Sequence, residues 1–132
     1  MKKLILILMI TLFSAACFAS EQRAIETAKA WLDIVDSGNY EESWSQAAPF
    51  FQSQLTSDQW VQAVDSVRSP LGDALSREVK NAAEHSTLPN APDGEYVVMT
   101  LDSSFENSES VVEAVAVIKL SGEWQVVGYF IN

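Results

Sequence analysis

The order of hydrophobic and polar positions divides this chain into a helical first half and a stranded second half. Between residues 21 and 37 apolar side chains recur at helical spacing, with charged residues on the opposite side, which predicts an amphipathic helix. Gly38 is expected to end this helix, because glycine readily adopts the left-handed conformation of a C-cap. After Gly72 the apolar positions alternate instead, which is the period of β-strands.

Capping signals predict two more helices in the first half. Asn39 followed three residues later by Glu42 is a candidate capping pair for a short helix, which Pro49 would stop. Thr56 and Gln59 repeat this spacing and predict a third helix that runs to the next proline.

Aromatic residues lie on the apolar stripes of all three predicted helices. They are expected to fill the space between the helices and the sheet, with stacking on a ligand as the alternative. These residues are Trp31, Tyr40, Trp44 and Trp60.

The second half predicts four strands joined by short turns. Ser121-Gly122 is expected to form a tight hairpin turn between the last two strands. Helices followed by consecutive strands indicate an α+β domain in which three N-terminal helices pack on one face of a curved four-stranded antiparallel sheet. The predicted strands cover residues 75–87, an edge-like strand, and then 96–105, 111–120 and 124–131.

The first nineteen residues have the organisation of a signal peptide. Lys2 and Lys3 precede an apolar run too short to span a bilayer comfortably, and small residues follow. Cleavage after Ala19 is expected, which leaves residues 20–132 as one exported domain, in the periplasm or outside the cell, without a transmembrane span. The alternative is a lipoprotein that is cut before Cys17 and anchored to the membrane by a lipid on that thiol, although Ser14 stands where such signals usually carry an aliphatic residue.

Composition limits the chemistry of the mature domain. Cys17 is the only cysteine, so cleavage after Ala19 leaves a domain without any disulfide. The signal carries two of the eight basic residues and none of the eighteen acidic ones, so the mature net charge is −12. Such a charge disfavours nucleic acid and anionic lipid as partners.

Several segments resemble the DUF4019 family, a small family of exported bacterial proteins of unknown function. The matching segments include WLDIVDSGNY at 31–40, VRSPLG at 67–72, LPNAPDGEYV at 88–97 and GYFI at 128–131. The resemblance covers nearly the whole mature chain. It implies a cystatin-like roll akin to nuclear transport factor two, and it implies no particular activity. Asn90 stands where the family more often has glycine, and asparagine also tolerates a left-handed conformation.

The candidate binding site consists of Arg68, Arg77, Tyr96 and Glu113. Glu113 interrupts an otherwise apolar strand, so its carboxylate needs a partner, and an arginine is the expected one. An ion pair that connects the third helix to the sheet is the structural interpretation, and a polar centre that grips a ligand is the functional one.

The other ionisable residues indicate no metal site. His85 is the single histidine and is expected on the strand surface, without a second histidine or a cysteine beside it. Acidic pairs such as Asp33 with Asp36 lack the spacing of a calcium loop and are expected to form a solvated face.

Nothing in the sequence indicates a catalytic nucleophile or a nucleotide-binding loop, so no cofactor is expected. We favour a non-catalytic exported module that binds a small molecule or an envelope protein through the helix–sheet cavity or its surface. The alternative is a proton-transfer enzyme that uses Glu113 with Tyr96 or Tyr40 in an apolar pocket. A cavity filled by tryptophan side chains would exclude that enzyme and favour a surface role. A third possibility is self-association through the outer face of the sheet.

Overall fold

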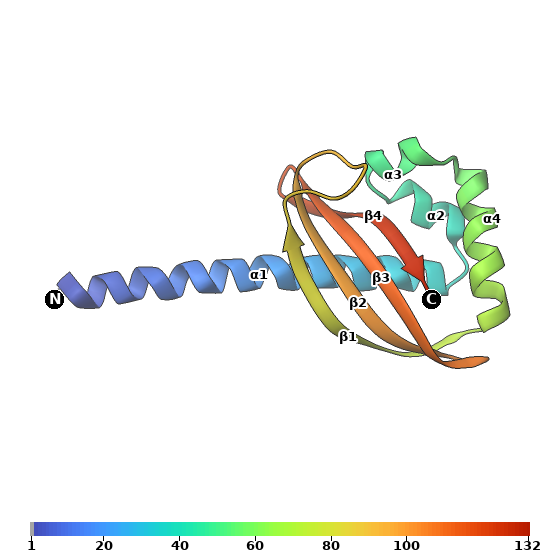
Figure 1. Ribbon diagram of the computed structural model, residues 1–132, viewed down its shortest axis with the longest axis horizontal. Coiled ribbons are helices and arrows are strands. Elements are labelled where there is room, and N and C mark those ends of the chain that lie inside the picture. The colour runs from blue at the N-terminus through green and yellow to red at the C-terminus, as the bar shows by residue number, and fades with distance from the viewer. Residues whose placement is uncertain (1) are drawn as a thin grey trace.

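Helices precede strands along the whole chain, as Figure 1 shows. The computed structural model describes residues 2–132, with side chains described from Phe18 onward. Within these residues the helices are α1 (Lys2–Asp36), α2 (Tyr40–Ser45), α3 (Pro49–Gln54) and α4 (Ser57–Arg68), followed by a 3-10 turn, η1 (Ser69–Leu71). The strands are β1 (Ala74–His85), β2 (Glu95–Phe105), β3 (Ser108–Leu120) and β4 (Glu123–Ile131).

The four strands form one antiparallel sheet in the order β1-β2-β3-β4. The sheet is curved, and the helices lie on one of its faces, with α1 crossing the strands (Figure 1). This arrangement confirms the predicted α+β class. Because side chains alternate along a strand, each row of paired residues faces either the helices or the opposite side.

The region of α2 and α3 differs from the prediction in two details. The side chain of Asn39 makes no capping hydrogen bond to α2, so the expected pair with Glu42 is wrong. Pro49 does stop α2, but it also begins the additional short helix α3, because the fixed φ of proline suits the first helical position. At α4 the capping box is present, with the Gln59 amide donating to Thr56 Oγ1 at 3.2 Å and the Thr56 amide donating to Gln59 Oε1 at 2.9 Å.

The predicted turn residues adopt left-handed backbone conformations. Gly38 ends α1 with φ at 79°, as expected. Ser121 and Gly122 have φ values of 52° and 83°, which gives the hairpin between β3 and β4 the two positive φ angles of a type I′ turn. Asn90 has φ at 60°, so asparagine keeps the conformation that glycine would supply.

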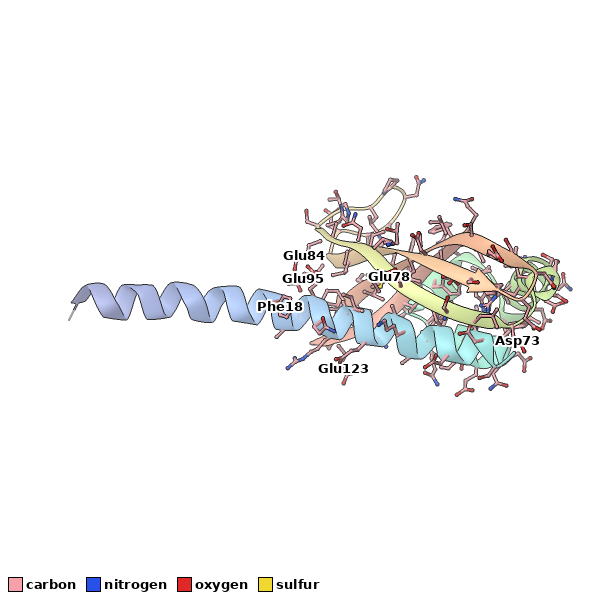
Figure 2. All side chains as sticks on the ribbon, turned by 90° about the horizontal axis from the view of Figure 1, so that it is seen from below. Phe18, Asp73, Glu78, Glu84, Glu95 and Glu123 are labelled. Atoms are coloured by element: carbon pink, nitrogen blue, oxygen red, sulfur yellow. The ribbon has the colours of Figure 1, made fainter. Side chains whose placement is uncertain are left out.

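Helix α1 begins at Lys2, well before the predicted start near residue 21. Its N-terminal part extends beyond the sheet as a single helix (Figure 1), and Phe18 lies where α1 leaves the domain, with 72% of its surface exposed (Figure 2). From Phe18 onward, the first fully buried residue of α1 is Ala24. The side chain of Cys17, the alternative lipid attachment point, lies outside the described residues. Among the described residues, no helix is long and apolar enough to cross a membrane.

Candidate functional site

A fully buried carboxylate, Glu113, lies on the helix-facing side of β3. Its two oxygens accept hydrogen bonds from three side chains on the other three strands. Arg77 of β1 donates from Nε at 2.6 Å and from Nη2 at 3.3 Å. Ser103 of β2 and Tyr129 of β4 donate through their hydroxyls. Glu113 is therefore the point at which all four strands are connected by side chains.

Arg77 extends this network from the sheet to the helices. Its guanidinium also donates to Asp36, with Nη1 at 2.8 Å from Oδ2 and Nη2 at 3.1 Å from Oδ1. Asp36 is the last residue of α1 and accepts a further bond from Arg68 Nη2, at 2.6 Å, at the end of α4. Two arginines and two carboxylates thus form a neutral chain, which satisfies the requirement that buried charges be paired.

The ionisation of this network follows from burial and pairing. Burial alone would raise the pKa of Asp36, but hydrogen bonds from Arg77 and Arg68, together with their charges, outweigh it and hold the pKa below its ordinary value of 3.8. Burial would lower the pKa of Arg77, but Asp36 and Glu113 raise it above its ordinary value. Burial and the charge of Glu113 raise the pKa of Tyr129. At neutral pH, Tyr129 is therefore a protonated donor and Asp36 an ionised acceptor.

The structure unites three of the four predicted site residues. Arg77 contacts Glu113 directly, whereas Arg68 is connected to it through Asp36 and then Arg77. The predicted connection from the third helix to the sheet therefore runs through the end of α1. Tyr96 lies apart from the network, because it belongs to the opposite face of the sheet and its hydroxyl donates to the Pro92 carbonyl.

Three residues of the network were not predicted from the sequence: Asp36, Ser103 and Tyr129. The expectation that Asp36 lies on a solvated acidic face is wrong, since its side chain is 23% exposed and bonded to two arginines. A signal was available at Asp36, because a carboxylate at a helix C-terminus opposes the helix dipole unless cations compensate it.

Aromatic side chains fill the space between the helices and the sheet. The Trp60 ring lies 5.9 Å from Trp31, 5.1 Å from Phe51 and 6.4 Å from Tyr129, measured between centroids. Both buried indoles are bonded through Ser43: Trp31 Nε1 donates to its carbonyl at 2.8 Å and Trp60 Nε1 to its hydroxyl at 2.9 Å. Trp31 and Trp60 are therefore part of the core, as predicted.

The two remaining predicted core aromatics are only partly buried. Tyr40 and Trp44 pack against the main core cluster from its edge, and Trp44 Nε1 donates to the Leu55 carbonyl at 3.0 Å. Tyr40 is not hydrogen-bonded to Glu113, whose described donors are Arg77, Ser103 and Tyr129. Proton transfer would require a free Glu113 carboxylate beside Tyr96 or Tyr40. The structure does not form this arrangement, because Glu113 is bonded to Arg77, Ser103 and Tyr129.

One cleft opens at the edge of the helix–sheet interface, between α1 and β4. It has a volume of 430 Å³, and its lining includes Trp31, Ile34, Gln46 and Trp124. The Trp124 ring also lies 5.8 Å from the ammonium group of Lys119. Glu113 does not line this cleft, so the cleft and the buried network are separate features.

The outer face of the sheet carries a partly exposed and mostly apolar strip. Two rows of paired residues form it: Val98, Ala116 and Gly128 in one row, and Thr100, Ala114 and Phe130 in the next. Phe130 is 67% exposed, and Val112 beside it is 45% exposed. A Cβ atom at Gly128 would lie 3.3 Å from the Phe130 ring, so this ring lies across Gly128 on the outer face. We call these residues, with Val112, the outer strip.

A loop and a polar hollow border the outer strip. At one end residues 86–94 fold over the sheet, and Leu88 and Ala91 pack against Tyr96 and Ile118. At the other end is a hollow of 490 Å³ that adjoins Val112. Its lining includes three carboxylates and three hydroxyls, from Ser76, Glu78, Asp102, Ser104, Glu109 and Ser110.

Positive charge near this hollow comes from Arg77 and Lys80. Arg77 lines the hollow, but its guanidinium is paired with the carboxylates of Asp36 and Glu113. The Lys80 ammonium lies 3.3 Å from Glu78 and 3.8 Å from Asp102, and all three side chains are at least half exposed. Such surface pairs contribute little and leave the hollow with an excess of negative charge.

The described residues contain no group of three or more His, Cys, Asp or Glu side chains placed to hold a metal ion. His85 is exposed at the end of β1, as predicted.

Comparison with family models gives a match over residues 27–129, which is most of the chain. Comparison with curated proteins and with solved structures gives no match.

Proposed function

This chain belongs to the family described as "Protein of unknown function (DUF4019)", and membership brings no activity with it. From the surface of the domain, we propose that the protein is an exported, non-catalytic interaction domain. The outer strip binds an apolar segment of a partner protein that also carries lysine or arginine. The exposed Phe130 ring on the outer strip is the observation that carries this proposal. Exposed aromatic residues are typical anchors of protein interfaces.

The charge of the domain supports a basic partner. The mature net charge of −12 and the carboxylates of Glu78, Asp102 and Glu109 beside the strip attract cationic side chains and repel acidic ones. The filled core and the fully bonded carboxylate of Glu113 support a surface role over a catalytic one.

Binding of a defined peptide tests this function. The peptide Lys-Val-Lys-Val-Lys-Val-Lys, with both ends blocked, supplies alternating apolar and cationic side chains. Phe130→Ser is expected to weaken its binding about tenfold or more, because it removes the central aromatic anchor. Titration followed by NMR measures the affinity.

The matched control is Val67→Ser on α4, which replaces an exposed valine on the helical side of the domain. This variant should bind the lysine peptide as the unsubstituted protein does, and a peptide with glutamate in place of lysine should not bind. Equal affinity of the Phe130→Ser variant, or equal binding of the glutamate peptide, would contradict the proposed function.

Export after cleavage at Ala19 is the second part of the proposal. Phe18 and Ala19 are exposed, and Ala24 is the first buried residue of α1 among those whose side chains are described. Cleavage after Ala19 would therefore leave the described core intact. Ser20 lines a hollow together with Glu84 and Glu95, which lie near each other at one end of the sheet (Figure 2). Cleavage would give Ser20 a free α-ammonium group, which would lie in this hollow with the carboxylates of Glu84 and Glu95.

Mass spectrometry of the protein from the cell envelope tests this cleavage. We expect a mature chain that begins at Ser20. A chain that begins at a diacylglyceryl-modified Cys17 would contradict release and show that the domain is tethered to the membrane instead.

A further inference from the structure

The two edge strands of the sheet, β1 and β4, differ in how well they are protected against pairing with another strand. β1 carries Arg77, Glu78, Lys80 and Glu84, and its pairing with β2 has two register shifts. Charges and bulges of this kind prevent an edge from pairing with other strands. β4 has a single charged residue, Glu123, at its first position, and one register shift.

The hydrogen-bond pattern shows which backbone groups of β4 face outward. Val112 and Asn132 exchange both backbone bonds, at 3.1 and 2.9 Å. Since bonded pairs recur every second residue in an antiparallel ladder, Phe130 also bonds to β3. The backbone N–H and C=O groups of Tyr129 and Ile131 therefore point away from the sheet.

Only one point of this edge is covered by a backbone bond among the described residues. The Ala48 amide donates to the Val126 carbonyl at 2.7 Å, where α3 begins. The outward amides of Tyr129 and Ile131 have no such partner within the same part of the chain. The last residues of β4 are thus an uncharged strand edge beside the most exposed residue of the outer strip, Phe130.

We propose that the edge of β4 from Tyr129 to Ile131 accepts an extended segment of a basic partner protein as a fifth strand. This inference rests on the proposed function and specifies how the partner binds. Backbone bonds to Tyr129 and Ile131 hold the added strand, and the side chain opposite Phe130 extends the outer strip.

The net charge of the domain favours a basic partner over a second copy of this chain at the edge of β4. Pairing of two β4 edges brings together two domains that each carry a net charge of −12, which opposes association. A strand with lysine or arginine at alternate positions has the complementary charge. The same alternation places its apolar residues on one face, beside Phe130.

Hydrogen exchange of the unsubstituted protein tests this mode of binding without any variant. The outward amides of Tyr129 and Ile131 should exchange rapidly in the free protein and at least tenfold more slowly with saturating Lys-Val-Lys-Val-Lys-Val-Lys peptide. The amide of Phe130, which bonds to β3, serves as the internal reference and should be protected in both states.

A proline variant gives an independent test. Ile131→Pro removes an outward donor while leaving the bonds between β3 and β4 in place, because proline is tolerated where the N–H faces away from the sheet. It should weaken peptide binding about tenfold relative to Ile131→Ala, which loses the side chain but keeps the N–H.

The possible outcomes separate the two proposals. Binding that requires Phe130 but leaves the Tyr129 and Ile131 amides unprotected would overturn the added strand and leave the proposed function standing. Absence of peptide binding to the unsubstituted protein would overturn both. Protection of these amides that grows with protein concentration, without peptide, would show that a second copy occupies the edge and would overturn the basic partner.

Discussion

Glu113→Ala is expected to lower the free energy of unfolding by about 3 to 5 kcal/mol, the usual cost of breaking a buried ion pair. The variant leaves Arg77 with one carboxylate instead of two and removes the acceptor of the Ser103 and Tyr129 hydroxyls. Polar groups that stay buried without partners account for most of this cost. Urea unfolding followed by circular dichroism measures the change.

Two further variants identify the cause of that loss. Glu109→Ala removes an exposed carboxylate from the same strand and should change stability by no more than about 0.5 kcal/mol. Glu113→Gln keeps the shape and some hydrogen bonds, so its cost should be smaller, about 1 to 3 kcal/mol. An unchanged unfolding midpoint in Glu113→Ala would contradict the structural role of the network.

Trp60→Ala should have an effect of similar size, about 3 to 5 kcal/mol, because it opens a cavity in the core. Trp60 packs against Trp31, Phe51 and Tyr129, and its loss also leaves the Ser43 hydroxyl without its indole donor. Thermal unfolding followed by circular dichroism measures this change.

The control on the same helix is Val67→Ala, whose side chain is 41% exposed and whose replacement should cost about 0.5 kcal/mol or less. If Trp60→Ala were as stable as this control, the space between helices and sheet would be an open pocket. Such a pocket would favour ligand binding between the helices and the sheet over a surface role.

The class of fold could be predicted from the sequence because its two periodicities are clear. Helical spacing before Gly72 and alternation after it define the two halves. Helix α3 was missed because its six residues are too few to show a periodicity. The start of α1 could not be located either, because the apolar run at residues 4–13 is also a good helix former.

The polar network was only partly predictable. Glu113 is conspicuous because it interrupts an apolar strand, and the scarcity of arginines points to Arg68 and Arg77. The face of each strand, however, depends on the register between strands. Leu101 pairs with Glu113 and Tyr96 with Ile118, which places Tyr96 on the opposite face.

Asp36 illustrates a second limit of sequence analysis. Its partners lie 32 and 41 positions later in the chain, and the local pattern gives no indication that the end of α1 meets the end of α4 and the start of β1. The exposure of Phe130 was hidden for the same reason, since an apolar residue in a β-strand gives no indication of which face is covered.

The most direct test of a surface role is an NMR map of where the Lys-Val-Lys-Val-Lys-Val-Lys peptide binds. We predict shifts of the Val112 and Val98 methyl signals and of the Phe130 ring on the outer strip. The indole signals of Trp31 and Trp124, which line the cleft between α1 and β4, should remain unchanged. Shifts of those indole signals without any change at Phe130 would contradict the account and place the binding site between the helix and the sheet.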